Sequence, residues 1–298
     1  MCGRYALFQP TQGVQLQFQF EFADPAATNL APNYNVAPTA NVPIVVEHYG
    51  RPVGEPRGGV VPEPQGAVRE LLLSRWGLVP GWARAGGNGP VLFNARLETA
   101  AEKPSFAESM AKRRCIFPMN GYFEWQTRQG DKQPFYISVP TTPLRGKAEE
   151  NGAVPKLGGA AETAELVRKY GTETAEKVGE PGTETAEKVQ ERGSGATPEL
   201  LGMAGLYSWW RKPGGAWLLS ATILTRPAQE NLRHIHHREP VALRSEEYAV
   251  WLDPNLQDGA AARELLRRPA PLLEAVAVRQ EVNNVRNNSP ENVRPLHD

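Results

Sequence analysis

The sequence has only two cysteines, no long apolar run and no excess of either charge. Cys2 and Cys115 are the only thiols among 298 residues, which excludes a disulfide framework and a four-thiolate zinc site. No stretch approaches the roughly 20 apolar residues that a membrane helix needs, and the first ten residues lack the apolar run of a secretory signal. Lys and Arg number 33, equal to Asp and Glu, so a basic site must be local. These absences predict a cytoplasmic protein without a membrane partner.

Residues 145–198 are nearly free of core-forming side chains. They contain Tyr170 as their only aromatic residue, no Ile, Met, Phe or Trp, and three repeats of eleven residues that start at 160, 171 and 182. A segment of this composition cannot bury a core, so we expect a disordered or loosely helical insertion. The residues on either side of it have strand-like patterns, which indicates that the insertion interrupts one domain.

The rest of the chain is rich in short β-like runs separated by a few helical stretches. The runs are at 42–49, 69–80, 114–125, 134–140, 203–210 and 216–225. Helices are predicted over 103–113, 227–234 and 245–252. No GxGxxG follows a strand and no GxxxxGK[ST] loop exists, which argues against nucleotide-binding folds. We therefore predict an α+β fold with an antiparallel sheet.

Cys2 is a candidate nucleophile because of its position. Methionine aminopeptidases remove Met1 when residue 2 is small, so the mature chain is expected to begin with a cysteine that has a free α-amine. The amine and the thiol titrate near neutrality and sit on adjacent carbons. Such a 1,2-aminothiol condenses with an aldehyde, first to a Schiff base and then to a five-membered thiazolidine. The alternative is that Cys2 has no chemical role.

Several polar residues stand in patterns that suggest a site. Asn94 and Arg96 are two residues apart and share one face of an extended segment. Glu124 lies between Phe123 and Trp125, where an unpaired carboxylate in a core strand is costly.

Three histidines follow the short helix predicted over 227–234: His234, His236 and His237. Zinc binding is one interpretation of them, and ordinary surface or core histidines are the other. We expect neither a metal nor a cofactor, because the H-x-H-H spacing is irregular and soft partner ligands are few.

Six motifs occur together in a characteristic order. They are MCGRYAL at the start, YNVAPT at 34–39, SRWGLVPGWA at 74–83, FNARLET at 93–99, RRCIFPMNGYFEW at 113–125 and TILTRPAQENLRHIHHREPVAL at 222–243. In this order they resemble the SOS response-associated peptidase (SRAP) family, whose members act on abasic sites in DNA. The resemblance covers residues 2–144 and 199–255 as one catalytic domain, and leaves 256–298 as a C-terminal extension.

The resemblance implies a fold, a partner and a catalytic group. The fold is a single domain around an antiparallel, barrel-like sheet, and the partner is single-stranded DNA that contains abasic sites. The implied catalytic residues are Cys2, Asn94, Glu124 and His236. The family pattern I-H-x-R-M-P reads I-H-H-R-E-P here, so Glu239 replaces the usual methionine and brings a negative charge beside Arg238.

The resemblance also implies a covalent DNA–protein crosslink between Cys2 and the aldehyde of an abasic site, which protects that site during the DNA damage response. The protein would act as a monomer, associated with the nucleoid when bound to DNA. Such a crosslinking enzyme could also have lyase or thiol-peptidase activity. The alternatives are a cysteine peptidase that acts on itself or on other proteins, and a passive single-stranded-DNA-binding module. Arginines suit phosphates and tryptophans suit bases, so the expected DNA contacts are Arg4, Trp76, Arg96, Trp125 and Arg238. Core packing is the competing role for both tryptophans.

Overall fold

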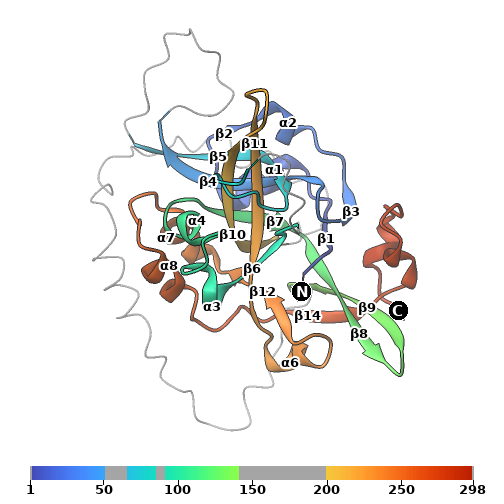
Figure 1. Ribbon diagram of the computed structural model, residues 1–298. Helices are drawn as coiled ribbons and strands as arrows, with labels where there is room; N and C mark the ends of the chain where they lie inside the picture. The colour runs from blue at the N-terminus through green and yellow to red at the C-terminus, as the bar shows by residue number, and fades with distance from the viewer. Residues whose placement is uncertain (1, 51–65, 85–90, 141–198, 297–298) are drawn as a thin grey trace, which may run out of the picture. The chain divides into compact units, whose positions relative to one another are not determined.

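Five antiparallel strands and one parallel contact form a closed barrel. A computed structural model describes residues 2–50, 66–84, 91–140 and 199–296, so the predicted insertion at 145–198 lies outside the described residues. The barrel strands are β4 (Asn41–Tyr49), β5 (Ala67–Trp76), β7 (Arg114–Met119), β10 (Leu201–Arg211) and β11 (Trp217–Pro227), in the order β11-β10-β7-β4-β5. Parallel pairing of Ser220 with Arg75 joins β11 to β5 and closes the ring. The predicted α+β fold with a barrel-like sheet is confirmed (Figure 1).

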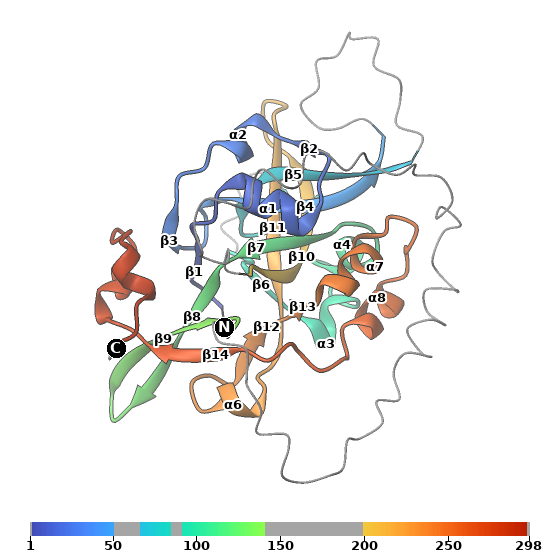
Figure 2. The same ribbon diagram turned by 180° about the vertical axis from the view of Figure 1, so that it is seen from behind.

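Most residues of the barrel strands are buried, because one face lines the barrel and helices or loops cover much of the other. Ile44, Val46, Phe117 and Met203 are all buried and belong to one continuous core. Around it lie α1 (Thr11–Phe18), α2 (Pro25–Thr28), α3 (Leu97–Ala100), α4 (Ala107–Lys112), α7 (Tyr248–Leu252) and α8 (Gly259–Leu265). The helices α3, α4, α7 and α8 gather on one side of the barrel (Figure 2). None of the described helices is long and apolar enough to cross a membrane.

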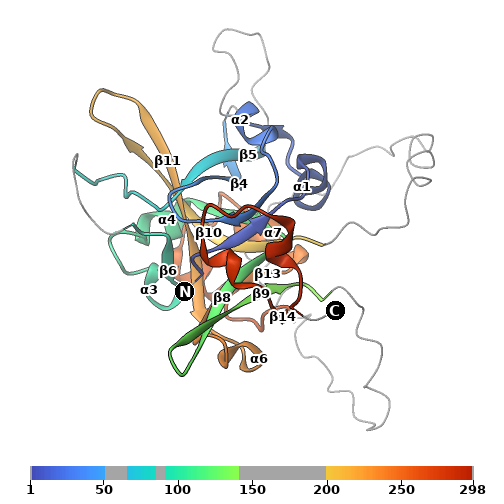
Figure 3. The same cartoon turned by 90° about the vertical axis from the view of Figure 1, so that its right-hand side faces the viewer.

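A second sheet of five strands lies beside the barrel. Its order is β14 (Glu274–Ala277), β9 (Asp131–Ser138), β8 (Gly121–Arg128), β1 (Tyr5–Leu7) and β3 (Asn33–Val36). The hairpin from β8 to β9, visible in Figure 3, turns through Gln129 and Gly130. Both turn residues have positive φ, which suits the twist of a two-residue hairpin.

The run 114–125, which appeared as one strand in the sequence, is two strands in different sheets. The barrel strand β7 ends at Met119 and β8 begins at Gly121. Between them, the side-chain Oδ1 of Asn120 accepts a hydrogen bond from the backbone N–H of Phe8 at 2.8 Å. A Cβ at Gly121 would lie 2.6 Å from the carbonyl oxygen of Ile137, so only glycine allows β8 and β9 to approach this closely.

The predicted helices are present but shorter than expected, and several short strands complete the fold. In place of 103–113 and 227–234 the structure has α4 and α6 (Glu230–Arg233), while 245–252 divides into a 3₁₀ turn (Ser245–Glu247) and α7. The remaining strands are β2 (Phe22–Ala23), β6 (Asn94–Arg96), β12 (Arg238–Pro240) and β13 (Ala242–Leu243). Beyond the end of β11 lie α6 and β12, which bring the histidine-bearing loop to the end of the barrel (Figure 1).

The residues predicted as a C-terminal extension are built into the fold. Strand β14 pairs with β9, from Glu274 opposite Ser138 to Ala277 opposite Phe135. The following segment, which includes two 3₁₀ turns (Gln280–Asn283 and Pro290–Val293), reaches β3. There the side-chain amide of Asn35 donates hydrogen bonds to the backbone carbonyls of residues 282, 284 and 287.

Candidate functional site

Cys2 lies at the start of the segment that leads into β1, within the hydrophobic core. Its side chain is fully buried. The side-chain Nδ2 of Asn94 donates a hydrogen bond to the Cys2 carbonyl oxygen at 2.8 Å. Asn94 is the first residue of β6 and is held opposite Ile223 by the parallel pairing of β6 with β11. The structure therefore brings together Cys2 and Asn94, which are 92 residues apart in the sequence.

Glu124 enters the same region from β8. That strand pairs with β1, and the N–H of Phe123 donates to the carbonyl oxygen of Arg4 at 2.9 Å. Glu124 is 4% exposed, and its burial raises the pKa of its carboxyl above the ordinary range. The thiol pKa of Cys2 is raised by burial and, secondly, by the charge of Glu124. The two side chains are therefore within electrostatic range of each other.

His236 lies in the loop between α6 and β12. Nδ1 of His236 lies 2.9 Å from the backbone nitrogen of Arg238 and 3.0 Å from its carbonyl oxygen, so this ring nitrogen can accept from the first or donate to the second. Burial lowers the pKa of His236, and the positive charge at the chain's N-terminus lowers it further. The same charge also lowers the pKa of Glu124, which burial raises. Glu124 and His236 therefore both lie within electrostatic range of the N-terminal charge.

Three of the four predicted catalytic residues carry ionisable side chains, and burial is the largest cause of the pKa shift of each. The raised thiol pKa corrects the expectation that Cys2 is partly thiolate at neutrality, because its burial disfavours the charged form. His236 is neutral and Glu124 is easier to protonate than an exposed glutamate. Asn94 contributes uncharged hydrogen bonds, and its buried Oδ1 accepts none from the described residues.

Arg4 and Trp125 contact each other on the opposite face of β8 from Glu124. The Arg4 guanidinium lies 5.6 Å from the centre of the Trp125 ring. Its Nη1 donates to Oδ1 of Asn35 at 2.7 Å and to the carbonyl oxygen of Val282 at 2.8 Å. The indole N–H of Trp125 donates to Asn283 Oδ1 at 2.6 Å. Two residues predicted to contact DNA therefore anchor the C-terminal segment.

Trp76 is a core residue, which corrects its predicted role in stacking on DNA bases. It is 0% exposed, and its indole N–H donates to the carbonyl oxygen of Phe93 at 2.9 Å. Its ring lies 5.2 Å from that of Tyr5. The position ends β5 where the barrel closes onto β11, so the side chain points into the protein.

The two remaining arginines differ in their surroundings. Arg96 is exposed at the end of β6. Arg238 instead forms an ion pair with Glu98, with its Nη2 at 2.9 Å from Oε2, and it also donates to the carbonyl oxygen of Thr225. The sequence predicted a negative charge from Glu239 beside Arg238. The Glu239 carboxylate is instead paired with Arg226, with Oε1 at 2.9 Å from Nε.

Sequence reasoning missed the C-terminal residues and the Arg226–Glu239 ion pair. The asparagine-rich run around Asn283, Asn284 and Asn287 was a signal that could have been used, because amide groups of side chains and backbone form the hydrogen bonds that hold irregular segments in place. For the ion pair, the sequence offers only two residues of opposite charge that are 13 positions apart.

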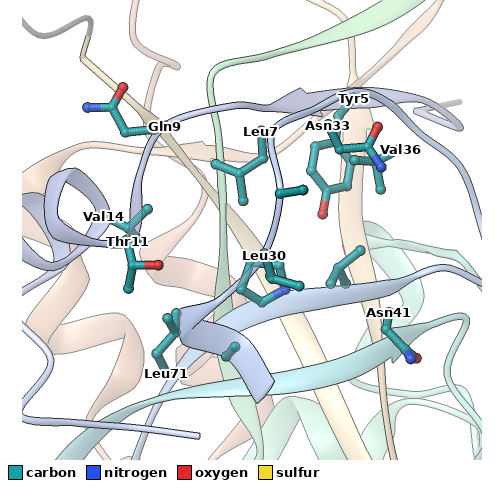
Figure 4. Close-up of a pocket in the computed structure, with 14 residues that line it drawn as sticks. Tyr5, Leu7, Gln9, Thr11, Val14, Leu30, Asn33, Val36, Asn41 and Leu71 are labelled. Atoms are coloured by element: carbon teal, nitrogen blue, oxygen red, sulfur yellow. The ribbon is translucent and has the colours of Figure 1, made fainter. Parts of the chain in front are cut away.

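A separate pocket lies between β1, α1, β3 and β4 (Figure 4). Tyr5, Leu7, Leu30 and Asn41 are among its lining residues, and none of the lining residues carries a charge. The predicted catalytic residues are not among them. No group of three or more His, Cys, Asp or Glu side chains able to hold a metal occurs within the described ranges.

Comparisons with known proteins identify relatives over nearly the whole chain. The abasic site processing protein YoqW of Bacillus subtilis (strain 168) is 29% identical over 292 residues, which are 98% of each chain. The abasic site processing protein HMCES of Pongo abelii is 32% identical over 284 residues, which are 93% of this chain and 68% of that protein. A crystal structure of a protein from Bacteroides thetaiotaomicron superposes with a TM-score of 0.65 at 22% identity and covers 99% of both chains, which shows the shared fold.

The family model described as "SOS response associated peptidase (SRAP)" matches residues 1–285. This match includes the segment of Cys2, the strands that carry Asn94 and Glu124, the loop of His236, and most of the described C-terminal segment. The chain therefore belongs to the SOS response associated peptidase family.

Proposed function

We propose that this protein processes abasic sites by forming a covalent crosslink between Cys2 and single-stranded DNA. The observation that carries the proposal is the buried contact of Cys2 with Asn94, within electrostatic range of Glu124. Relatives named abasic site processing proteins, similar over nearly the full chain, support the same substrate.

The reaction begins with the α-amine of Cys2, which becomes free when Met1 is removed. An unprotonated amine attacks C1′ of the ring-opened deoxyribose and forms a carbinolamine. Loss of water then gives an imine. The thiol adds across the C=N bond, its proton passes to the nitrogen, and a thiazolidine ring is formed without any oxidant or reductant. The thiol can close the ring only after the imine has formed, and because burial raises its pKa a base must take its proton in that step.

The surrounding side chains would assist the proton transfers. Glu124, buried with a raised pKa, suits a base that takes a proton from the thiol and later returns it. His236, whose imidazole can take up a proton and pass it on as the imidazolium, suits the group that relays a proton to the leaving hydroxyl group. The free Oδ1 of Asn94 can accept a hydrogen bond from the Cys2 amine and orient it.

DNA contacts would surround this centre. Arg96 is exposed and suits a phosphate on the strand. Arg238 and Arg4 are partly exposed, and their guanidinium groups are oriented by Glu98 and Asn35 respectively. Trp125 is partly exposed, and the part of its ring that Arg4 does not cover can contact a base.

The test is a denaturing gel of the protein with an oligonucleotide that contains one abasic site. We expect a heat-stable adduct with wild type and with Cys115→Ala, the matched control at the other buried thiol. Cys2→Ser should give little heat-stable adduct, but borohydride should trap its imine. Glu124→Gln and His236→Ala should each slow adduct formation by about 10² to 10⁴.

Three results would contradict the proposal. Equal heat-stable adduct with Cys2→Ser would exclude the thiazolidine. A mass measurement that finds Met1 retained in active protein would exclude the imine. Cleaved protein without adduct would indicate a peptidase, and DNA binding without adduct or cleavage would indicate a passive binder.

A further inference from the structure

Glu239 forms a buried ion pair at the base of the loop that carries His236. It lies on β12 directly opposite Arg226 on β11, and it is 1% exposed. The Nε of Arg226 donates to its Oε1 at 2.9 Å. Its second oxygen, Oε2, accepts a hydrogen bond from the backbone N–H of Gln229 at 3.1 Å, where the loop leaves β11.

The same contacts close the loop and tie it to a distant part of the chain. At the base of the loop, the N–H of Ala228 donates to the carbonyl oxygen of His237 at 3.0 Å. Nη1 of Arg226 donates to the carbonyl oxygen of Arg268 at 2.9 Å. The side chain of Gln229 reaches the carbonyl oxygen of Pro271 at 3.3 Å. Loop 228–237 is thus fixed at both ends and against the segment after α8.

Stability alone does not explain a charged pair at this position. Burying a carboxylate and a guanidinium removes both from water, and an apolar pair of similar volume is often equally stabilising. What a methionine could not supply is the second carboxylate oxygen, which binds the backbone of the loop. The carboxylate therefore specifies the conformation of the loop in a way that apolar packing would not.

We propose that Glu239 is a positioning residue, which holds loop 228–237 so that His236 faces the reaction centre. It touches neither Cys2 nor Asn94 in the described contacts and acts through Arg226 and Gln229. The expected change in the rate of adduct formation rests on the proposed function. The expected change in the position and titration of His236 can be measured without DNA.

The geometric consequence is a change in the titration of His236. Its ring stacks on His237 at 4.4 Å, a second titratable group whose pKa is lowered by the charge of His236, and the charges of the N-terminus and of Arg238 lower the pKa of His236. Burial is the largest cause of its lowered pKa. If Glu239 no longer fixes the loop, His236 gains solvent and its pKa rises toward the ordinary value of about 6.5.

The experiment compares Glu239→Met, Glu239→Gln and the double variant Arg226→Met/Glu239→Met. The pKa of His236 is read from its ring-proton resonances by NMR titration, with His236→Gln to assign the signal. Adduct formation with an abasic oligonucleotide is timed on the same samples. Glu247→Gln is the matched control, because Glu247 also accepts a backbone N–H at the start of a short helical turn, that of Arg244 at 2.8 Å, but outside loop 228–237.

We expect Glu239→Met to raise the His236 pKa and to slow adduct formation by about tenfold, less than the roughly 10² to 10⁴ lost when a proton-handling group is removed. Glu239→Gln keeps an acceptor oxygen, so both the His236 pKa and the rate of adduct formation should change less than in Glu239→Met. The double variant should recover thermal stability but not the wild-type titration, because Gln229 still lacks its acceptor. Glu247→Gln should leave both readouts unchanged.

An unchanged His236 titration in folded Glu239→Met, or in the double variant if the single one does not fold, would overturn the proposal. Recovery of both readouts in the double variant would also overturn it, since the pair would then be purely structural. If wild type forms no adduct while the titration shifts as expected, the proposed function fails and the positioning role stands.

Discussion

Replacing Trp76 by leucine distinguishes a core role from a role in DNA stacking. The side chain is 0% exposed and packs between Tyr5 and Phe93. Loss of the indole hydrogen bond should cost about 0.5 to 1.5 kcal/mol, because the Phe93 carbonyl still accepts from the N–H of Ile223 at 3.2 Å. The smaller side chain should cost roughly 2 to 4 kcal/mol more, near the lower part of the range for large-to-small core changes.

The free energy of unfolding should therefore fall by about 2.5 to 5.5 kcal/mol, which for a domain of this size lowers Tm by roughly 5 to 22 °C. Thermal unfolding followed by circular dichroism measures it. Trp217→Leu is the matched control, because Trp217 is 61% exposed and its replacement should change stability by less than about 0.5 kcal/mol.

DNA binding by folded Trp76→Leu, measured by fluorescence anisotropy well below its Tm, should equal that of wild type. A stacking contact would instead cost about 1 to 3 kcal/mol of binding free energy. Wild-type stability combined with weakened binding would refute the assignment of Trp76 to the core.

Two further predictions concern charge. The Glu70 hydrogen bond, at 3.1 Å, raises the pKa of His48 in the folded state, so its stabilising effect is fully present below the unfolded value of about 6.5 and is lost as pH rises through the folded value. His48→Gln should thus lose most stability near pH 5.5 and little near pH 9 in urea unfolding; an equal loss at both pH values would contradict this. Arg96→Gln should weaken initial binding to single-stranded DNA and reduce the log-log salt slope by about 0.7, the value for one phosphate contact. An unchanged slope would remove Arg96 from the DNA interface.

Much of the fold could be predicted because its signals are local. The alternating or continuous apolar runs of β4, β10 and β11 predicted strands within a few residues of their bounds. The short helices were placed correctly but too long, because the apolar spacing continues into turns that have no helical hydrogen bonds. The break at Asn120 was missed, since only the pairing of β8 with β1 shows that the chain changes sheets there.

The candidate site shows the same division. The types of residue present, a thiol at position 2, an amide, a carboxylate within an apolar run and a histidine cluster, follow from the sequence and indicate aldehyde and proton chemistry. The sequence does not show which of them meet. The contact between Asn94 and Cys2 depends on β6 pairing with β11, and the raised thiol pKa depends on burial that strands from both sheets create.

Some roles were decided by tertiary structure alone. A tryptophan in SRWGLVPGWA and one in GYFEW have similar local patterns, yet Trp76 faces the barrel core and Trp125 faces Arg4 and Asn283. The sequence by itself determined which chemical groups the chain carries and the approximate positions of its long strands β4, β10 and β11, because these depend on neighbouring residues. Tertiary structure decided burial, ion-pair partners and pKa values, because these depend on residues from strands and loops that are far apart in the chain.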